Sequence, residues 1–174
     1  MITIKMPIIF IINIMKIDRF SGRWHFLSNF YPCDIFHEGI HYPSVEHFYV
    51  AMKFNDEQLI DGKYYTTGDL RELISKIDSP GKVKKIGKKI KLRKDWKSKK
   101  LNFMNWAIRE KFKDPKLSEL LISTGDLEII EGNYWGDTYW GVCDGQGENN
   151  LGKILMKVRD ELNGNRKGLE DILK

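Results

Sequence analysis

The sequence predicts a single globular domain that is mostly helical and has a few short strands. Its 174 residues suffice for one sizeable core. Hydrophobic residues make up 41% of the chain and charged residues 30%, which is typical of a water-soluble globular protein. Helical spacing of apolar residues recurs along the chain, whereas patterns typical of strands are confined to short runs. We find no internal repeat, linker or transmembrane segment.

The two ends of the chain are expected to lie outside this domain. The run MPIIFIINIM within residues 1–16 is too short to span a bilayer, although its β-branched content would also suit an added strand. Met15, the last residue of that run, begins MKIDRF, which looks like a natural start, so we interpret the first 14 residues as an extension that is dispensable for function and leave residues 1–16 outside the domain. The domain is placed at residues 17–162, and we expect the polar tail, residues 163–174, to fray.

The first element within the domain is a predicted β-hairpin, in which DIF and IHY flank Glu38-Gly39. The same stretch, from His37 to His41, matches the H-E-x-x-H pattern of zinc proteases. That motif needs a helix, but a glycine stands at its centre and Pro43 follows closely. We therefore expect a surface hairpin, and neither a metal nor a cofactor.

A helix is predicted from Pro43 to Phe54, with the proline in its first turn. Glu46 and Lys53 are seven residues apart, so they fall on one face of this helix, while His47 belongs to a second face. A carboxylate and an amine that point into one pocket suit acid/base or imine chemistry on a sugar. The alternative is a solvated Glu and Lys beside an apolar stripe.

The later elements follow from helical spacing, proline positions and one β-branched run. We predict helices at Tyr64–Lys76, from Ser79-Pro80 onwards, at Trp96–Phe112 with Asp95 as the cap, at Pro115–Ile122 and from Asn150 to about Leu162, and a strand at Leu127–Glu131.

The chain is most basic between Lys82 and Lys100, where eleven Lys or Arg face a single acid, Asp95. Such a stretch attracts phosphates and nucleic acid. Arg93 is the side chain best suited to grip a phosphate, because its guanidinium can bind two oxygens at once. The alternative is a solvated helix face whose lysines serve solubility.

A loop rich in aromatic residues and glycine, YWGDTYWGVCDGQG, precedes the last helix. Trp135 and Trp140 could stack on a base, with the Asp137 carboxylate beside it. Two half-buried tryptophans that close the core are an equally good interpretation. The N-terminus of the last helix, at Asn150, could hold an anion.

The two cysteines, Cys33 and Cys143, form no C-x-x-C pair and no disulfide framework. They indicate free thiols in a reducing compartment, which we take to be the cytoplasm.

Six motifs, in order, resemble the NADAR family, which is also called YbiA-like. They are FLSNFYP, YPSVEHFYVAMKF, SPGKVKKIGKKIKLRKDW, KFKDPKLSELLISTGDLEIIE, DTYWG and ENNLGKILMKVRDEL. The resemblance runs from about Phe26 to Leu162, nearly the whole domain. It implies an α+β fold, mostly helical, with a polar pocket and N-glycosidase activity.

The resemblance also implies one of two substrate classes. One is ADP-ribose attached to a nucleobase, notably guanine in nucleic acid. The other is the phosphoribosylamino-pyrimidine intermediates of riboflavin synthesis. Two further possibilities remain open, namely a non-catalytic reader of ADP-ribose and a nucleic-acid-binding module that acts through the basic stretch. No membrane partner is expected.

Carried over position by position, the resemblance assigns Glu46 to acid/base work and Lys53 to a Schiff base with the opened ribose. The pocket positions that it implies are Asn29, His47, Arg93, Asp95, Trp96, Asp137, Trp140, Gly141 and Asn150. The chain departs from the family pattern after Gly141, where Val142 and Cys143 precede the next Asp-Gly pair.

Overall fold

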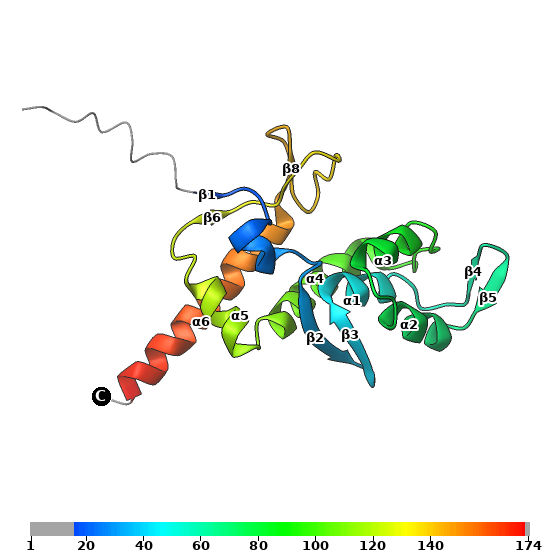
Figure 1. The fold of residues 1–174 in the computed structure, drawn as a ribbon, viewed down its shortest axis with the longest axis horizontal. Helices are drawn as coiled ribbons and strands as arrows, with labels where there is room; N and C mark the ends of the chain where they lie inside the picture. The colour runs from blue at the N-terminus through cyan, green and yellow to red at the C-terminus, as the bar shows by residue number, and fades with distance from the viewer. Residues whose placement is uncertain (1–15, 173–174) are drawn as a thin grey trace, which may run out of the picture.

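A computed structural model describes residues 16–172, which fold around a central helix, α1 (Figure 1). The helices in this range are η2, a 3-10 helix (Gly22–Leu27), α1 (Val45–Ala51), α2 (Thr67–Ser75), α3 (Pro80–Gly87), α4 (Trp96–Lys111), α5 (Pro115–Ile122) and α6 (Asn150–Ile172). The strands are β1 (Lys16–Ile17), β2 (Pro32–His37), β3 (Ile40–Ser44), β4 (Gln58–Ile60), β5 (Lys63–Tyr65), β6 (Glu128–Ile129), β7 (Gly132–Asn133) and β8 (Val142–Cys143). The α+β fold with a small β component is confirmed.

The strands pair two by two and form no common sheet. The pairs β2–β3 and β4–β5 are antiparallel hairpins, whereas β1–β6 and β7–β8 are parallel. The pair β1–β6 joins segments far apart in sequence and carries the start of the described chain onto β6, whereas β7–β8 closes a short loop. The expected extension, residues 1–16, lies outside the described residues except for Lys16, which already belongs to β1.

Helix α1 is buried along its whole length, from Val45 to Ala51. It contacts α2, α3, α4 and both strands of the β2–β3 hairpin. Its N-cap is Ser44, whose hydroxyl accepts the backbone N–H of His47. The predicted helix therefore starts two residues later than expected, because Pro43 lies in β3, and it ends before Lys53, which lies in the following turn.

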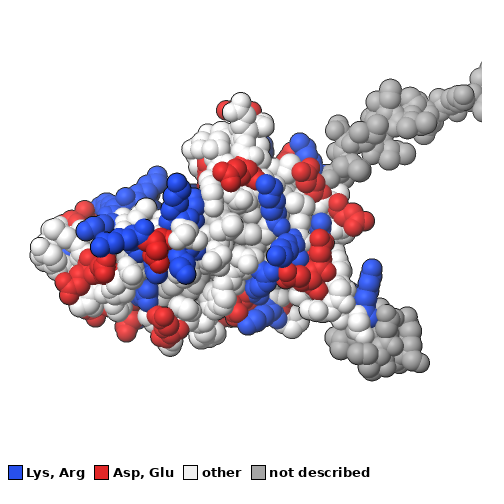
Figure 2. Space-filling view, turned by 180° about the vertical axis from the view of Figure 1, so that it is seen from behind, with Lys and Arg blue, Asp and Glu red and all other residues white. Residues whose placement is uncertain are grey.

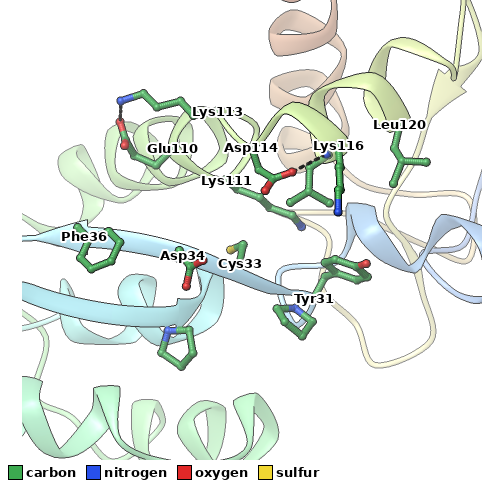
Figure 3. A pocket seen from close by; sticks show the side chains of 13 residues that line it. Tyr31, Cys33, Asp34, Phe36, Glu110, Lys111, Lys113, Asp114, Lys116 and Leu120 are labelled. Atoms are coloured by element: carbon green, nitrogen blue, oxygen red, sulfur yellow. Dashed lines mark hydrogen bonds and ion pairs between the residues drawn. The ribbon is translucent and has the colours of Figure 1, made fainter.

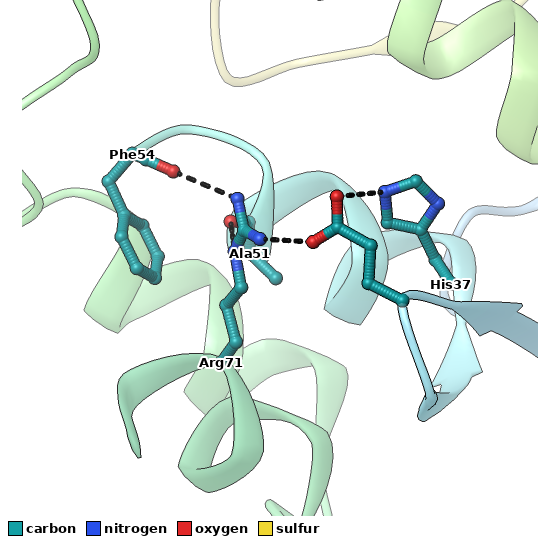
Figure 4. A network of polar contacts seen from close by, with 5 residues as sticks. His37, Ala51, Phe54 and Arg71 are labelled. Atoms are coloured by element: carbon teal, nitrogen blue, oxygen red, sulfur yellow. Dashed lines mark hydrogen bonds and ion pairs between the residues drawn. The ribbon is translucent and has the colours of Figure 1, made fainter. Parts of the chain in front are cut away.

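The β2–β3 hairpin is confirmed, with His37 opposite Ile40 and a turn at Glu38-Gly39. Both turn residues have positive φ, which suits a two-residue hairpin turn. Figure 4 shows how the turn is held: the Glu38 carboxylate lies between His37 and Arg71, and Arg71 also donates to the carbonyls of Ala51 and Phe54. The acid of the H-E-x-x-H match is thus an anchor between the hairpin and α2.

The two histidines of that match have separate partners. His37 packs on the Phe48 and Trp106 rings, and His41 contacts Asp34, 2.7 Å away. Within residues 16–172, no group of three His, Cys, Asp or Glu side chains could hold a metal ion. No helix in this range is long and apolar enough to cross a membrane.

The remaining helices differ little from the predicted ones. Helix α5 has the predicted bounds, and Asp114 caps it by accepting the Leu117 N–H. Helix α2 begins only at Thr67, because the preceding residues form the hairpin β4–β5. Helix α6 continues to Ile172, ten residues beyond its predicted end near Leu162, and the predicted strand 127–131 shortens to β6.

Candidate active site

A pocket of about 680 Å³ opens beside α1, between the segment after η2, helices α3 and α4, and the loop between β7 and β8. Six predicted site residues line it: Asn29, Glu46, Lys53, Trp96, Asp137 and Trp140. Its other lining residues are Ser28, Phe30, Tyr49, Gly81, Lys84, Lys85, Lys88, Lys100, Met104, Glu131, Trp135 and Tyr139.

Glu46 and Lys53 face this pocket together, as the helical spacing predicted. Glu46 is only 8% exposed, and burial raises the pKa of its carboxyl, while Lys84 and Lys53 act in the opposite direction. Burial likewise lowers the pKa of the Lys53 amine, although Glu46 opposes that shift. Both pKa values thereby shift toward neutral, where a side chain is most effective as an acid, base or nucleophile.

The Lys53 amine rests against α3. It donates to the carbonyl of Gly87 over 3.4 Å, and a Cβ added at Gly87 would lie 3.2 Å from the amine and 2.9 Å from Val50 Cγ2. The glycine therefore lets α3 approach α1 closely enough to hold the lysine. The backbone N–H of Arg93 also donates to the Lys53 carbonyl, over 2.8 Å, and so fixes this turn.

Asn29 forms the floor of the pocket beside the start of α1. Its backbone carbonyl accepts the N–H of Glu46 over 3.0 Å, and its amide nitrogen contacts the sulfur of Met104. Its Oδ1 atom is buried and has no hydrogen-bond partner within residues 16–172. An unpaired acceptor in a pocket wall is suited to a hydroxyl or N–H of a ligand.

Aromatic rings line one wall. Tyr49 on α1 lies 5.0 Å from Trp96 and 5.6 Å from Trp140, measured between ring centroids. Burial raises the pKa of the Tyr49 hydroxyl well above its ordinary value, so this group stays protonated. Trp96 is 9% exposed and Trp140 is half-buried, so both help to close the core while their edges reach the pocket.

Asp137 is fixed by its own loop. Its Oδ1 atom accepts the backbone N–H groups of Tyr139 and Trp140, at 3.2 and 2.9 Å. The side chain of Asn133 in turn binds both the N–H and the carbonyl of Asp137. This turn, rather than the sequence spacing alone, places the carboxylate and Trp140 at the pocket.

The positive charge at the pocket comes from part of the basic stretch. Lys84, Lys85, Lys88 and Lys100 line it, and Figure 2 shows Lys and Arg side chains gathered over the end of the molecule that carries α3. Two of the four contact aromatic rings: Lys84 lies 5.2 Å from the Trp135 centroid, and Lys100 lies over Tyr139. The rim therefore offers cations and ring faces side by side.

The comparison with protein families gives a match over most of the chain. A family model described as the NADAR domain matches residues 19–163. The chain belongs to the NADAR family. N-glycosidase YbiA of Escherichia coli (strain K12) is 36% identical over 139 residues, which cover 78% of this chain and 79% of that protein. The NMR structure of the E. coli protein YbiA matches with a TM-score of 0.71 and 31% identity, covering 87% of this chain and 88% of that one.

Other similar proteins carry names from riboflavin biosynthesis. Riboflavin biosynthesis protein VVA0006 of Vibrio vulnificus (strain YJ016) is 36% identical over 141 residues, or 79% of this chain. This chain spans only 35% of that protein's length. The expected enzyme class, a glycosidase that hydrolyses N-glycosyl compounds, agrees with the names of the N-glycosidase relatives.

Two NADAR positions predicted for the pocket lie beside it and do not line it. The ring of His47 points to the other side of α1, where its Nε2 donates to the Ile77 carbonyl over 2.9 Å. Its Nδ1 therefore accepts from the Ser44 hydroxyl, and burial lowers the pKa of the imidazole. Asn150 donates its amide to the carbonyl of Tyr139 and to Glu148, so it holds the aromatic loop in place.

Arg93 and Asp95 are also absent from the pocket lining, because they bind each other. Both guanidinium contacts, at 2.5 and 3.0 Å, go to the two oxygens of Asp95. The aspartate is consequently at the N-cap position of α4 without capping it through its side chain. Gly141 does not line the pocket either; a Cβ there would collide with the backbone carbonyl of Glu131, so the glycine allows this close approach of the backbone.

The most important residue that the sequence analysis missed is Glu131. We assigned it to the end of a strand, whereas the structure places it just after β6, at the pocket. Its carboxyl is largely buried, and burial, together with nearby Asp137, raises its pKa to about 7. The available signal in the sequence was an acid, Glu131, at the end of a predicted strand and directly before Gly132.

A second hollow, of about 770 Å³, lies between β2 and the segment joining α4 to α5 (Figure 3). None of the predicted site residues lines it. Lys111 reaches from α4 toward β2, is 1% exposed, and donates to the carbonyl of Ser28 over 2.8 Å. Since Ser28 also lines the active-site pocket, Lys111 supports that pocket from behind.

Proposed function

We propose that this NADAR protein removes ADP-ribose from ADP-ribosylated nucleobases by hydrolysing the C–N glycosidic bond, and that the modified base is guanine in nucleic acid. The observation that carries the proposal is the pair Glu46 and Lys53 at one pocket, with the acid and the amine both moved toward neutral pH. The N-glycosidase names of the relatives support the reaction, and the family resemblance supports the substrate.

The pocket has the size and charge for such a ligand. A volume of about 680 Å³ is within the range of sites for nucleotide-sized molecules. The four lysines at its rim, Lys84, Lys85, Lys88 and Lys100, suit the two phosphates of ADP-ribose. The ring faces of Trp135 and Tyr139 beside them suit a base.

Cleavage of a glycosidic C–N bond builds positive charge on the anomeric carbon and negative charge on the departing base. An ionised Glu46 near the ribose stabilises the first. It can also take a proton from a ribose hydroxyl, so that the ring opens and the neutral amine of Lys53 attacks C1′ as an imine former. The basic residues of the rim hold the phosphates during either route.

A second candidate is hydrolysis of phosphoribosylamino-pyrimidine intermediates of riboflavin biosynthesis. The names of the Vibrio relative and of a maize relative, Riboflavin biosynthesis protein PYRR, favour it. That substrate carries one phosphate instead of two, so it should depend less on the lysine rim.

The two candidates are separated by measuring kcat/KM of the wild type on each substrate and then on rim variants. We expect faster turnover of ADP-ribosylated guanine DNA and a KM raised roughly tenfold in a variant with Lys85→Met and Lys88→Met. The matched control is Lys97→Met with Lys99→Met, since these exposed lysines belong to the basic stretch but do not line the pocket. Turnover of the pyrimidine alone would reject ADP-ribose as the substrate.

A further inference from the structure

Glu131 is a second buried acid of the pocket, and its backbone is fixed on both sides. Its N–H donates to Asn149 Oδ1 over 3.1 Å, and its carbonyl accepts the N–H of Val142 over 2.9 Å. Gly141 packs directly against that carbonyl. The side chain therefore starts from a fixed backbone position and lines the pocket.

The charged groups around the Glu131 carboxyl come from three other elements. Asp137 faces it from the β7–β8 loop, Glu46 from α1 and Lys84 from α3. Burial and the two acids raise the pKa of Glu131 to about 7, whereas Lys84 opposes the rise. Its Oε2 atom is buried without a hydrogen-bond partner in the described part of the chain. With a pKa of about 7, a substantial fraction of this carboxyl is protonated at neutral pH, so it has a proton to give.

Burial is the main cause that raises the pKa of both acids of the pocket, but their strongest charged neighbours have opposite signs. Glu46 has Lys84 and Lys53 as its strongest charged neighbours, and both favour its ionised form. Glu131 has Asp137 as its strongest charged neighbour, which favours its protonated form. The charged neighbours thus favour Glu46 as the carboxylate and Glu131 as the acid, a division of roles that two carboxyls in one site can adopt.

We propose that Glu131 is the proton donor to the departing base, while Glu46 faces the sugar as a carboxylate. This assignment rests on the proposed glycosidase function. The C1′–N bond breaks with its electron pair on nitrogen, and the Glu131 proton moves to the departing base. The oxygen of water bonds to C1′ and its proton passes to Glu46, after which exchange with solvent restores both acids.

The test is the pH profile of Glu131→Gln on whichever of the two substrates the wild type turns over. The amide keeps the shape of the side chain but cannot give up a proton. We expect kcat to fall roughly 10²–10⁴-fold with KM changed less than threefold, because general acid catalysis is of that size. The wild-type decline of kcat/KM above about pH 7 should vanish in this variant.

The matched control is Glu128→Gln, the same change at an exposed acid three residues earlier, which should leave the profile intact. Glu131→Asp keeps an acid and should keep the alkaline decline at a lower kcat, which also serves if the Gln variant folds poorly. The assignment of Glu131 is overturned, with the proposed function intact, if Glu131→Gln keeps more than a tenth of the wild-type kcat or retains the alkaline decline. A wild type inactive on both substrates overturns the proposed function as well.

Discussion

Replacing Lys111 by methionine should flatten the dependence of stability on pH. The amine is buried, and burial lowers its pKa to about 7 from an ordinary value of 10.5. A depressed folded-state pKa means that the unfolded chain binds more protons between these two values, so the free energy of unfolding rises with pH there. Stability is highest above the unfolded value and is lost as the pH falls toward 7.

The size of the effect follows from these two values. The full difference corresponds to roughly 5 kcal/mol, of which about 2 kcal/mol develops between pH 7 and pH 9. That window stays below the titration of Tyr42, whose pKa burial raises to about 12. Glu131, whose pKa is also about 7, titrates in both proteins, so urea unfolding across this window should show a change with pH that is about 2 kcal/mol more favourable in the wild type than in Lys111→Met.

The control for Lys111 is Lys113→Met, which removes an exposed lysine two residues later on the same segment. This variant should keep the wild-type slope. Equal slopes in the wild type and Lys111→Met would refute the claim that the amine is buried as a neutral group against the Ser28 carbonyl.

Three further predictions concern single sites. Borohydride added during turnover should trap a covalent adduct of the wild type but not of Lys53→Met, and an active wild type without an adduct would remove the imine step. Gly152→Ala should lower the free energy of unfolding by about 1–3 kcal/mol, because the new Cβ would collide with the backbone carbonyl of Ile129. Gly164→Ala is the control, because no atom lies near the new Cβ, and it should cause no such loss. Equal urea midpoints for the two variants would contradict this prediction. If the substrate is nucleic acid, Lys85→Met should reduce the salt slope of single-stranded DNA affinity by about one, and an unchanged slope would place the phosphates elsewhere.

Local signals predicted the elements that are determined locally. Proline at the start of α5 and the turn at Glu38-Gly39 give the correct helix and hairpin without reference to the rest of the chain. The turn at Asp61-Gly62 carries an equally clear Asp-Gly signal for β4–β5, which the sequence analysis overlooked. Pro43 was placed in the helix because proline suits a first turn as well as a strand at the edge of a hairpin.

Helical spacing alone predicted the central pair of the site, and the family resemblance added Asn29, Trp96, Asp137 and Trp140. The seven-residue spacing brought Glu46 on α1 and Lys53 in the turn after it to the same pocket. Arg93 and Asp95 were assigned to a ligand because the sequence cannot reveal that they bind each other. Glu131 was missed because its role depends on neighbours from α1, α3 and the β7–β8 loop, which only the fold brings together.

Glu46→Gln assayed for release of unmodified DNA from ADP-ribosylated guanine DNA tests the central claim most directly. The account predicts release by the wild type, a loss of roughly 10²-fold or more in Glu46→Gln, and no loss in Glu119→Gln, which alters an exposed acid on α5. Retained release by Glu46→Gln would contradict the account, as would a wild type that binds ADP-ribose without any turnover.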